Sequence, residues 1–204
     1  MNSSGFTLWL TGVPCSGKST IARTLARRFL RRGRRVEVLD GDLVRQSLSY
    51  GLGFNREDRD RNIRRIAFVA SLLARNGVIV IVAVVSPYRA ARDEARRSLG
   101  RFFEVHVDCP ISECERRDVK GMYKRARAGE LRGFTGVDDP YEAPLEPELT
   151  VATNLQSSEE SAARIESALL ESQWLSASDP DLGDTPEIER RYSELFVWRE
   201  QTQK

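Results

Sequence analysis

The chain has 204 residues, of which 40% are hydrophobic and 30% charged, and its formal net charge is only +2. This balance is typical of a soluble globular protein with one main domain. A membrane-spanning segment is excluded, because the longest apolar run, from Val78 to Val85, is far shorter than the roughly 18 to 20 residues that cross a bilayer.

The predicted elements alternate between strand and helix along the chain. Short apolar runs predict strands over residues 6–11, 35–39, 78–85, 102–107 and 149–152. Helical spacing of apolar residues predicts helices over residues 20–30, 57–75, 89–99, 111–117 and 161–170. This order indicates an α/β fold, with a mostly parallel sheet of about five strands and helices on both faces. Ligands of such sheets bind at the carboxyl ends of the strands, so functional residues should follow the strands directly.

Residues 12–19 follow the first predicted strand, read Gly-Val-Pro-Cys-Ser-Gly-Lys-Ser, and match the phosphate-binding pattern G-x-x-x-x-G-K-[ST]. The loop precedes a predicted helix, as a working phosphate loop requires. Its N–H groups should bind the phosphates of a nucleotide, with Lys18 on the β- and γ-phosphates and the hydroxyl of Ser19 or Thr20 on Mg²⁺. The predicted nucleotide-binding residues are Gly12, Val13, Pro14, Cys15, Ser16, Gly17, Lys18, Ser19 and Thr20. A glycine-rich turn without a ligand is the alternative, and Pro14 removes one N–H from the cradle.

Two acidic residues follow the second predicted strand in the sequence Asp40-Gly-Asp42. Asp42 is the candidate for holding the water shell of Mg²⁺ or for accepting a proton from an attacking hydroxyl group. Asp40 either has a functional role or caps the helix that begins near Leu43, and the residues alone do not decide between the two. The predicted central strand has no acidic residue at its end, a position where many phosphate-loop proteins hold a metal, and Asp42 would compensate for this.

The charges divide unevenly between the two halves of the chain. Residues 1–100 hold 19 basic residues against 8 acidic ones, whereas residues 101–204 hold 13 against 22. Arginines around the end of the first predicted helix are expected on a solvated helix face, where the helix dipole favours them. They are Arg27, Arg28, Arg31, Arg32, Arg34 and Arg35. A nucleic-acid patch is the alternative, but no aromatic interleaving or binding motif accompanies it, so we expect no nucleic-acid partner.

Seven further stretches point to one family. They are Leu39-Asp-Gly-Asp-Leu-Val-Arg45, Leu52-Gly-Phe54, Asp58-Arg59, Asn62-Ile-Arg-Arg-Ile66, Ser86-Pro-Tyr-Arg89, Arg117-Asp-Val-Lys-Gly-Met-Tyr-Lys-Arg-Ala126 and Phe134-Thr-Gly-Val-Asp-Asp-Pro-Tyr-Glu142. In this order, over residues 6–171, the chain resembles the adenylylsulfate kinases. The resemblance implies a P-loop NTPase fold and a Mg²⁺-dependent kinase of sulfate assimilation, which converts ATP and adenosine 5′-phosphosulfate to ADP and 3′-phosphoadenylylsulfate. Another small-molecule or nucleotide kinase on this fold, or a regulatory protein that binds nucleotide without turnover, are the alternatives.

The same resemblance implies a set of substrate-binding residues. Arg45 and Arg59 match anion-binding arginines, which suits a substrate with a phosphate joined to a sulfate, because guanidinium groups bind such oxygens in pairs. Phe54 and Phe134 match a pair of rings that sandwiches the substrate adenine. The full predicted set is Asp40, Arg45, Phe54, Arg59, Asn62, Ile63, Ser86, Lys120 and Phe134.

Residues 117–136 are basic, glycine-punctuated and poor in apolar residues, which predicts a mobile lid over the two nucleotides; a disordered surface loop is the alternative. The resemblance gives Lys120 of this lid a phosphate or substrate contact, so the predicted catalytic residues are Lys18, Asp42, Ser86 and Lys120. Ser86 matches a position described as phosphorylated in this family. The only histidine, His106, lies in a predicted strand and is expected in the core. Because no general base is evident, we expect direct in-line transfer, with Ser86 organising the site.

The chain is expected to comprise a kinase domain over residues 1–173 and a partly helical extension over 174–204. The extension shows near-helical spacing of Ile188, Tyr192, Leu195, Phe196 and Trp198, and it packs either on its own domain or on a partner. We further expect a homodimer and a functional link to an ATP sulfurylase. The three cysteines form neither a disulfide framework nor a metal spacing, and no secretion signal is evident, so the expected location is the cytoplasm.

Overall fold

A five-stranded parallel sheet forms the centre of the molecule in the computed structural model, which describes residues 5–196. The strands are β1 (Phe6–Thr11), β2 (Arg35–Asp40), β3 (Val78–Ala83), β4 (Phe102–Asp108) and β5 (Leu149–Ala152), in the spatial order β2-β3-β1-β4-β5. Neighbouring strands all run parallel. The predicted P-loop type of α/β fold is therefore confirmed.

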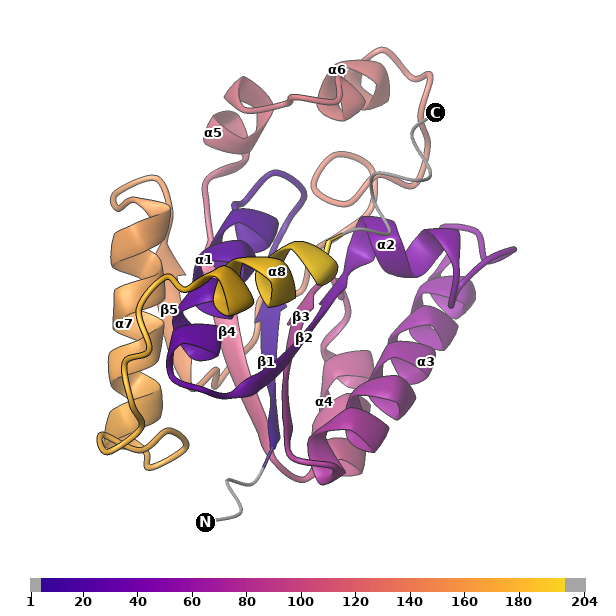
Figure 1. Ribbon diagram of the computed structural model, residues 1–204. Coiled ribbons are helices and arrows are strands. Elements are labelled where there is room, and N and C mark those ends of the chain that lie inside the picture. The colour runs from indigo at the N-terminus through magenta and orange to yellow at the C-terminus, as the bar shows by residue number, and fades with distance from the viewer. Residues whose placement is uncertain (1–4, 197–204) are drawn as a thin grey trace.

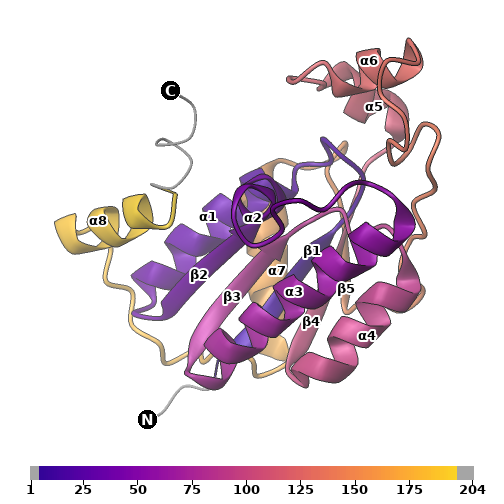
Figure 2. The same ribbon diagram turned by 90° about the vertical axis from the view of Figure 1, so that its right-hand side faces the viewer.

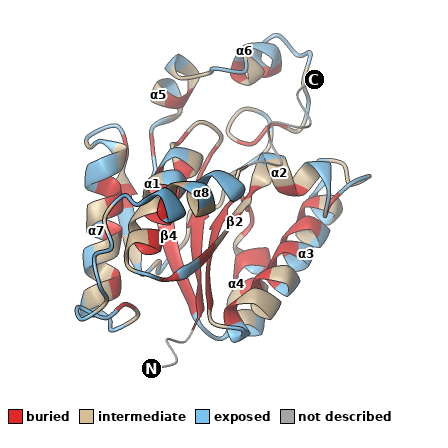
Figure 3. Cartoon of the chain, viewed as in Figure 1, coloured by how far each residue is buried: buried red, intermediate tan, exposed pale blue. Residues whose placement is uncertain are grey.

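Helices cover both faces of the sheet (Figures 1 and 2). On one face, α1 (Lys18–Arg31) and α7 (Ser158–Glu171) pack on alternate residues of β1, among them Phe6 and Leu8. On the other face, α3 (Arg56–Arg75) and α4 (Arg89–Leu99) form a second core around Trp9. Because β1 and β3 are buried on both sides, their sequences are continuous apolar runs, and the strands are red along their length in Figure 3.

The remaining helices are short or lie at the edge of this core. They are α2 (Gly41–Gln46), α5 (Ile111–Arg116), α6 (Met122–Arg127) and α8 (Pro186–Glu194). Helices α5 and α6 stand above the carboxyl edge of the sheet in Figure 2, on the side where β1 and β2 end. Among residues 5–196, no helix is long and apolar enough to cross a bilayer.

The third strand ends at Ala83, two residues earlier than the apolar run predicts. Val84 is still buried in the second core, although it has left the strand ladder. The chain turns at Ser86, which adopts a φ of +40°. Hydrophobicity alone therefore overestimates the length of the strand, because Val84 is buried by its packing in the second core and not as a residue of β3.

The C-terminal extension packs on its own chain. Helix α8 begins at a Thr185 cap and lies against α1, and Ile188 is buried in the same core as β1. The guanidinium of Arg27 lies 4.5 Å from the ring centre of Tyr192 and also pairs with Glu189. Leu195 and Phe196 pack on this core too, whereas Trp198 is outside the described residues.

Three arginines of α1, which are Arg27, Arg28 and Arg31, are neutralised by acidic residues from the second half of the chain. Arg28 pairs with Glu159 and Glu166 of α7, and Arg31 pairs with Asp181 of the extension. The uneven division of charge along the sequence therefore becomes a pairing in space. The sequence predicts a solvated helix surface here, whereas the structure shows ion pairs from α1 to α7 and to the extension.

Candidate functional site

The phosphate loop connects the end of β1 to the first turn of α1. Two of its glycines have positive φ angles, +157° at Gly12 and +99° at Gly17. A side chain at Gly12 would also collide with the structure, because its Cβ would lie 2.4 Å from the carbonyl oxygen of Val107. Both glycine positions of the motif are therefore required by the backbone itself.

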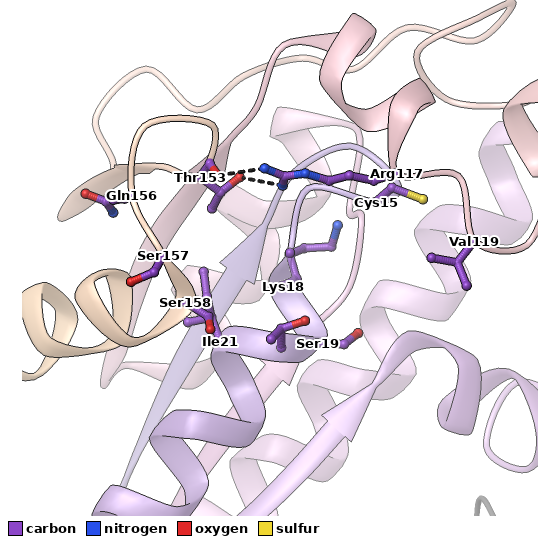
Figure 4. Close-up of a pocket in the computed structure, with 12 residues that line it drawn as sticks. Cys15, Lys18, Ser19, Ile21, Arg117, Val119, Thr153, Gln156, Ser157 and Ser158 are labelled. Carbon is purple, nitrogen blue, oxygen red and sulfur yellow. Dashed lines mark hydrogen bonds between the residues drawn. The ribbon is translucent and has the colours of Figure 1, made fainter.

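Lys18 is enclosed by the loop to which it belongs (Figure 4). Its Nζ donates hydrogen bonds to the carbonyl oxygens of Gly12 at 2.8 Å and Val13 at 2.7 Å. Burial lowers the pKa of Lys18 to about 8, even though Asp40 acts in the opposite direction. A phosphate group within reach of Nζ would supply the negative charge that this buried ammonium lacks.

Asp40 joins β2 to the phosphate loop. Its Oδ2 accepts a hydrogen bond from the Ser19 hydroxyl at 2.5 Å, and its Oδ1 caps α2 by accepting from the N–H of Asp42 at 3.1 Å. Asp40 is thus both a helix cap and a neighbour of the loop hydroxyl. The two readings that the sequence left open are compatible.

The metal-site prediction named Ser19 and Asp42. Asp42 has an exposed carboxylate that pairs with Lys120 of the lid, whereas the carboxylate beside Ser19 is that of Asp40. A hydroxyl group and two carboxylates at one sheet edge are suitable oxygen donors for Mg²⁺, which keeps several waters and is bound by few side chains plus phosphates. Within residues 5–196, no group of three or more His, Cys, Asp or Glu residues is arranged to hold a metal.

A cavity of about 630 Å³ opens beside the phosphate loop. Besides loop residues, it is lined by Arg117 and Val119 from the start of the lid and by Thr153, Gln156 and Ser157 after β5. Figure 4 shows Arg117 reaching across to Thr153, with 2.7 Å from Nη2 to the carbonyl oxygen.

The sequence interpretation omitted these cavity residues from the site. Thr153 also donates a hydrogen bond of 2.8 Å to the carbonyl oxygen of Ser16 in the phosphate loop. A signal for it existed, because Thr153 directly follows the last predicted strand, at the edge where ligands of parallel sheets bind.

The arginines predicted to bind anions are held by neighbouring backbone. Arg45 donates to the carbonyl oxygens of Leu52 and Gly53, and its guanidinium lies 4.3 Å from the ring centre of Phe54. Burial and nearby Arg59 lower the pKa of Arg45. A bound anion would reverse this effect, because it would favour the charged guanidinium.

Arg59 connects the two segments that carry the predicted adenine-binding rings. It donates to the carbonyl oxygens of Phe54 at 2.6 Å and Gly133 at 2.5 Å, and to the Thr135 hydroxyl at 2.7 Å. Phe54 is 53% exposed, whereas Phe134 is buried and its ring packs edge-on against the ring of Tyr123. The structure therefore brings both ring-bearing segments to one place, with one ring open to a ligand.

Asn62 and Ile63 lie on the buried face of α3. Ile63 is part of the second core. The side-chain oxygen of Asn62 is buried and has no hydrogen-bond partner among the described residues. Such an oxygen is costly unless a donor reaches it, so it marks a place where a polar group of a ligand would be favourable.

Ser86 is buried, and its hydroxyl is engaged at both ends. It accepts a hydrogen bond from Trp9 Nε1 at 3.1 Å and donates one to Thr11 Oγ1 at 2.9 Å. His106 stacks on Tyr141, and partial burial lowers its pKa, so it lies at the margin of the core rather than inside it as predicted. Within the described residues, Ser86 is therefore not an exposed nucleophile, and His106 is not hydrogen-bonded to it as a base.

The predicted lid contains structure of its own. Helix α6 and Phe134 enclose a small apolar cluster in which Tyr123 is buried, together with Val13 of the phosphate loop. The Tyr123 hydroxyl donates to the carbonyl oxygen of Pro14 at 3.0 Å. The segment is therefore richer in buried contacts than its sequence suggests. It rests directly on the phosphate loop, and Lys120 is exposed at its edge.

Comparisons with known proteins agree with this geometry. The family model described as Adenylylsulphate kinase matches residues 4–152. An adenylyl-sulfate kinase of Picosynechococcus is 55% identical over 84% of this chain and 97% of its own length, and one of Rippkaea orientalis is 56% identical over 81% and 91%. The structure of the Mycobacterium tuberculosis APS kinase in complex with AMPPNP and APS is 43% identical, with a TM-score of 0.79 over 81% of this chain and 98% of that one.

Proposed function

The chain belongs to the adenylylsulfate kinase family, and we propose how its residues carry out the reaction of that family. The enzyme transfers the γ-phosphoryl group of ATP to the 3′-hydroxyl of adenosine 5′-phosphosulfate, and the products are ADP and 3′-phosphoadenylylsulfate. The observation that carries this assignment is the identity of about 55% over more than nine-tenths of the length of the relatives, together with a family model whose match, residues 4–152, spans the phosphate loop and the substrate motifs. ATP is the donor, and Mg²⁺ is the metal that accompanies it.

The donor nucleotide is proposed to bind between the phosphate loop and the start of the lid. The loop N–H groups and Lys18 hold the phosphates, and the cavity lined by Arg117, Thr153 and Gln156 takes the nucleoside. Support comes from the position of this cavity, which adjoins the loop and extends to Ser158 at the start of α7. Ser19, Asp40 and Asp42 are the residues that would hold Mg²⁺, directly or through water, and the ion would supply charge neutralisation for the phosphates.

The acceptor is proposed to bind between α2, α3 and residues 134–142, which begin at the end of the lid. Phe54 and Phe134 take the adenine, and Arg45 and Arg59 take the phosphosulfate. Arg59 keeps the two ring-bearing segments at a fixed separation through its contacts to Phe54 and Gly133. The unsatisfied oxygen of Asn62 supports a polar contact to substrate at this place.

Transfer is proposed to be direct and in line. Such a reaction needs positioning and charge neutralisation, and it needs little covalent chemistry from the protein. Lys18 and Lys120 approach from the loop and from the lid, so two cations converge on the transferring phosphoryl group. The present pairing of Lys120 with Asp42 keeps the lid lysine at the same edge of the sheet.

The decisive test is an ADP-release assay under four conditions: with adenosine 5′-phosphosulfate, with AMP, with a sugar and without any acceptor. We expect release with adenosine 5′-phosphosulfate far above the other three. A matched variant, Lys18→Met, should abolish release with every acceptor. Equal rates with all acceptors would refute the substrate assignment, whereas a clear preference for a sugar would identify another kinase on this fold.

We also propose a homodimer in the cytoplasm that works beside an ATP sulfurylase. The cysteines Cys15, Cys109 and Cys114 are free thiols, as a reducing compartment favours. Phe68 of α3 is 65% exposed, a large apolar side chain that a second subunit would cover. The acceptor must come from an enzyme that joins sulfate to the adenylyl group of ATP. Sedimentation at several protein concentrations tests the dimer, and Phe68→Asp should dissociate it.

A further inference from the structure

Arg92 is a buried arginine that the reaction scheme leaves without a role. It lies in the first turn of α4 and is only 2% exposed. Its Nε donates to Glu104 of β4 at 2.8 Å, its Nη1 to the carbonyl oxygen of Ser86 at 2.6 Å, and its Nη2 to the carbonyl oxygen of Glu142 at 2.6 Å. One guanidinium group therefore connects three separate segments of the chain.

The first of these segments is the turn after β3. Ser86 occupies a positive φ of +40°, which residues other than glycine rarely adopt. Such a conformation persists only when its surroundings hold it. Its side chain is fixed by Trp9 and Thr11, and its carbonyl group by Arg92. Arg92 is thus part of what keeps this turn in place.

The second segment runs from Phe134 to Glu142 and returns from the lid. The Glu142 N–H donates to the carbonyl oxygen of Pro87 at 2.8 Å, and its carboxylate accepts from the Arg89 N–H at 2.8 Å. Asp139 of the same segment accepts from the Tyr88 hydroxyl at 3.0 Å. The segment that carries Phe134 is therefore hydrogen-bonded to the residues that follow Ser86, and Arg92 donates a hydrogen bond to each of the two segments.

We propose that Arg92 is a positioning residue for the acceptor half of the site. It fixes the separation between the Ser86 turn and the Phe134–Glu142 segment. Through that segment it also fixes the position of Phe134, against which the acceptor adenine rests. This inference relies on the proposed acceptor site. None of the three partners of Arg92 lines the donor cavity, so the effect of Arg92 is confined to the acceptor.

Glu104 serves a different purpose, because it compensates the buried charge of Arg92. It is 5% exposed and also accepts from Arg96 at 3.1 Å, one turn further along α4. Arg96 shares Glu104 with Arg92, and its other side-chain hydrogen bonds go to Glu148 rather than to the site. Arg96 is therefore a matched control that changes the ion pair and leaves the two carbonyl contacts intact.

The test compares Arg92→Gln, Arg92→Lys and Arg96→Gln in the intact chain. For Arg92→Gln we expect the KM for adenosine 5′-phosphosulfate to rise by about tenfold, as the loss of charge-assisted hydrogen bonds implies, with the KM for ATP within about twofold of the parent. Arg92→Lys keeps the charge but lacks the planar fork, so it should restore stability more fully than acceptor KM. Arg96→Gln should leave both KM values within about twofold.

The outcomes separate the inference from the proposed function. If Arg92→Gln raises both KM values equally, or if Arg96→Gln raises the acceptor KM as much, Arg92 is only structural and the inference is wrong. If Arg92→Gln does not fold, Arg92→Lys supplies the same comparison of the two KM values. If the parent enzyme itself does not use adenosine 5′-phosphosulfate, the proposed function fails before Arg92 is tested.

Discussion

Replacement of Ile188 by alanine should show that the C-terminal extension is part of the stable fold. Ile188 lies in α8, is 1% exposed, and belongs to the core that contains β1, α1 and α7. The substitution removes three carbon atoms from this core. At about 0.8 kcal/mol for each buried CH₂ group, the transfer term is roughly 2.4 kcal/mol. A residual cavity adds to it, so we expect the free energy of unfolding to fall by about 3 kcal/mol.

Leu182→Ala is the matched control for this prediction. It also removes three carbon atoms from the extension, but Leu182 is 47% exposed. We therefore expect it to lower the free energy of unfolding by less than about 1 kcal/mol. In thermal melts, Ile188→Ala should lower Tm by about 6 to 12 °C, because 1 kcal/mol corresponds to about 2 to 4 °C in a chain of this size.

Urea unfolding followed by circular dichroism is the assay, with the m-value as a check that the unfolding transition is unchanged. Kinase activity at 25 °C should be retained in Ile188→Ala, since no residue of α8 lines the donor cavity. Equal losses of stability in Ile188→Ala and Leu182→Ala would refute the packing of α8 on α1. A chain that ends at Gln173 should be less stable than the parent, because it lacks both Ile188 and buried Leu175.

Three further predictions concern the reacting groups. The pKa of Lys18 is about 8 in the free protein, against an ordinary 10.5, so ATP affinity should fall as pH rises above about 8. Between pH 8 and 10.5 the unfolded chain holds a proton on Lys18 that the folded protein has lost, so the free energy of unfolding of the free protein should rise with pH in this range. Titrations of ATP from pH 7 to 9.5 check this, and Lys18→Met should remove the dependence. In Mg²⁺ titrations, Asp40→Asn should raise the half-saturating concentration by about tenfold, more than Asp42→Asn, because Asp40 contacts Ser19. Ser86→Ala should keep turnover within about tenfold of the parent; a kinetically competent phosphoserine in the parent would contradict direct transfer.

Local patterns were sufficient to predict the donor half of the fold. The strand before the phosphate loop, the loop and the helix after it are neighbours in sequence, and apolar periodicity with two glycines defines them. The end of β3 differs from the prediction, because Val84 and Val85 continue the apolar run after the strand has ended at Ala83. Periodicity reports burial, and it does not report whether a buried residue still belongs to the strand ladder.

Contacts between distant segments were not predictable from such patterns. The lid looked poor in apolar residues, yet Tyr123 and Phe134 are buried together, because each covers the other and the phosphate loop lies below. The pairing of Ser19 with Asp40 rather than Asp42 depends on how β2 lies beside α1. An arginine in an exposed-looking helix gives no sign in sequence of the burial that Arg92 has.

The two halves of the site therefore differ in how the chain encodes them. The phosphate-binding part of the donor half is formed by one continuous loop, and its residues are recognisable from spacing alone, whereas Arg117 and Thr153 of the adjoining cavity come from distant segments. The acceptor half depends on Arg59 and Arg92, each of which connects segments far apart in the sequence. The resemblance to a family identifies Arg59, whereas only the structure identifies Arg92. Substitutions in the loop should consequently abolish catalysis with any acceptor. Substitutions at the two arginines should change which acceptor is held and how well, while ATP binding is retained.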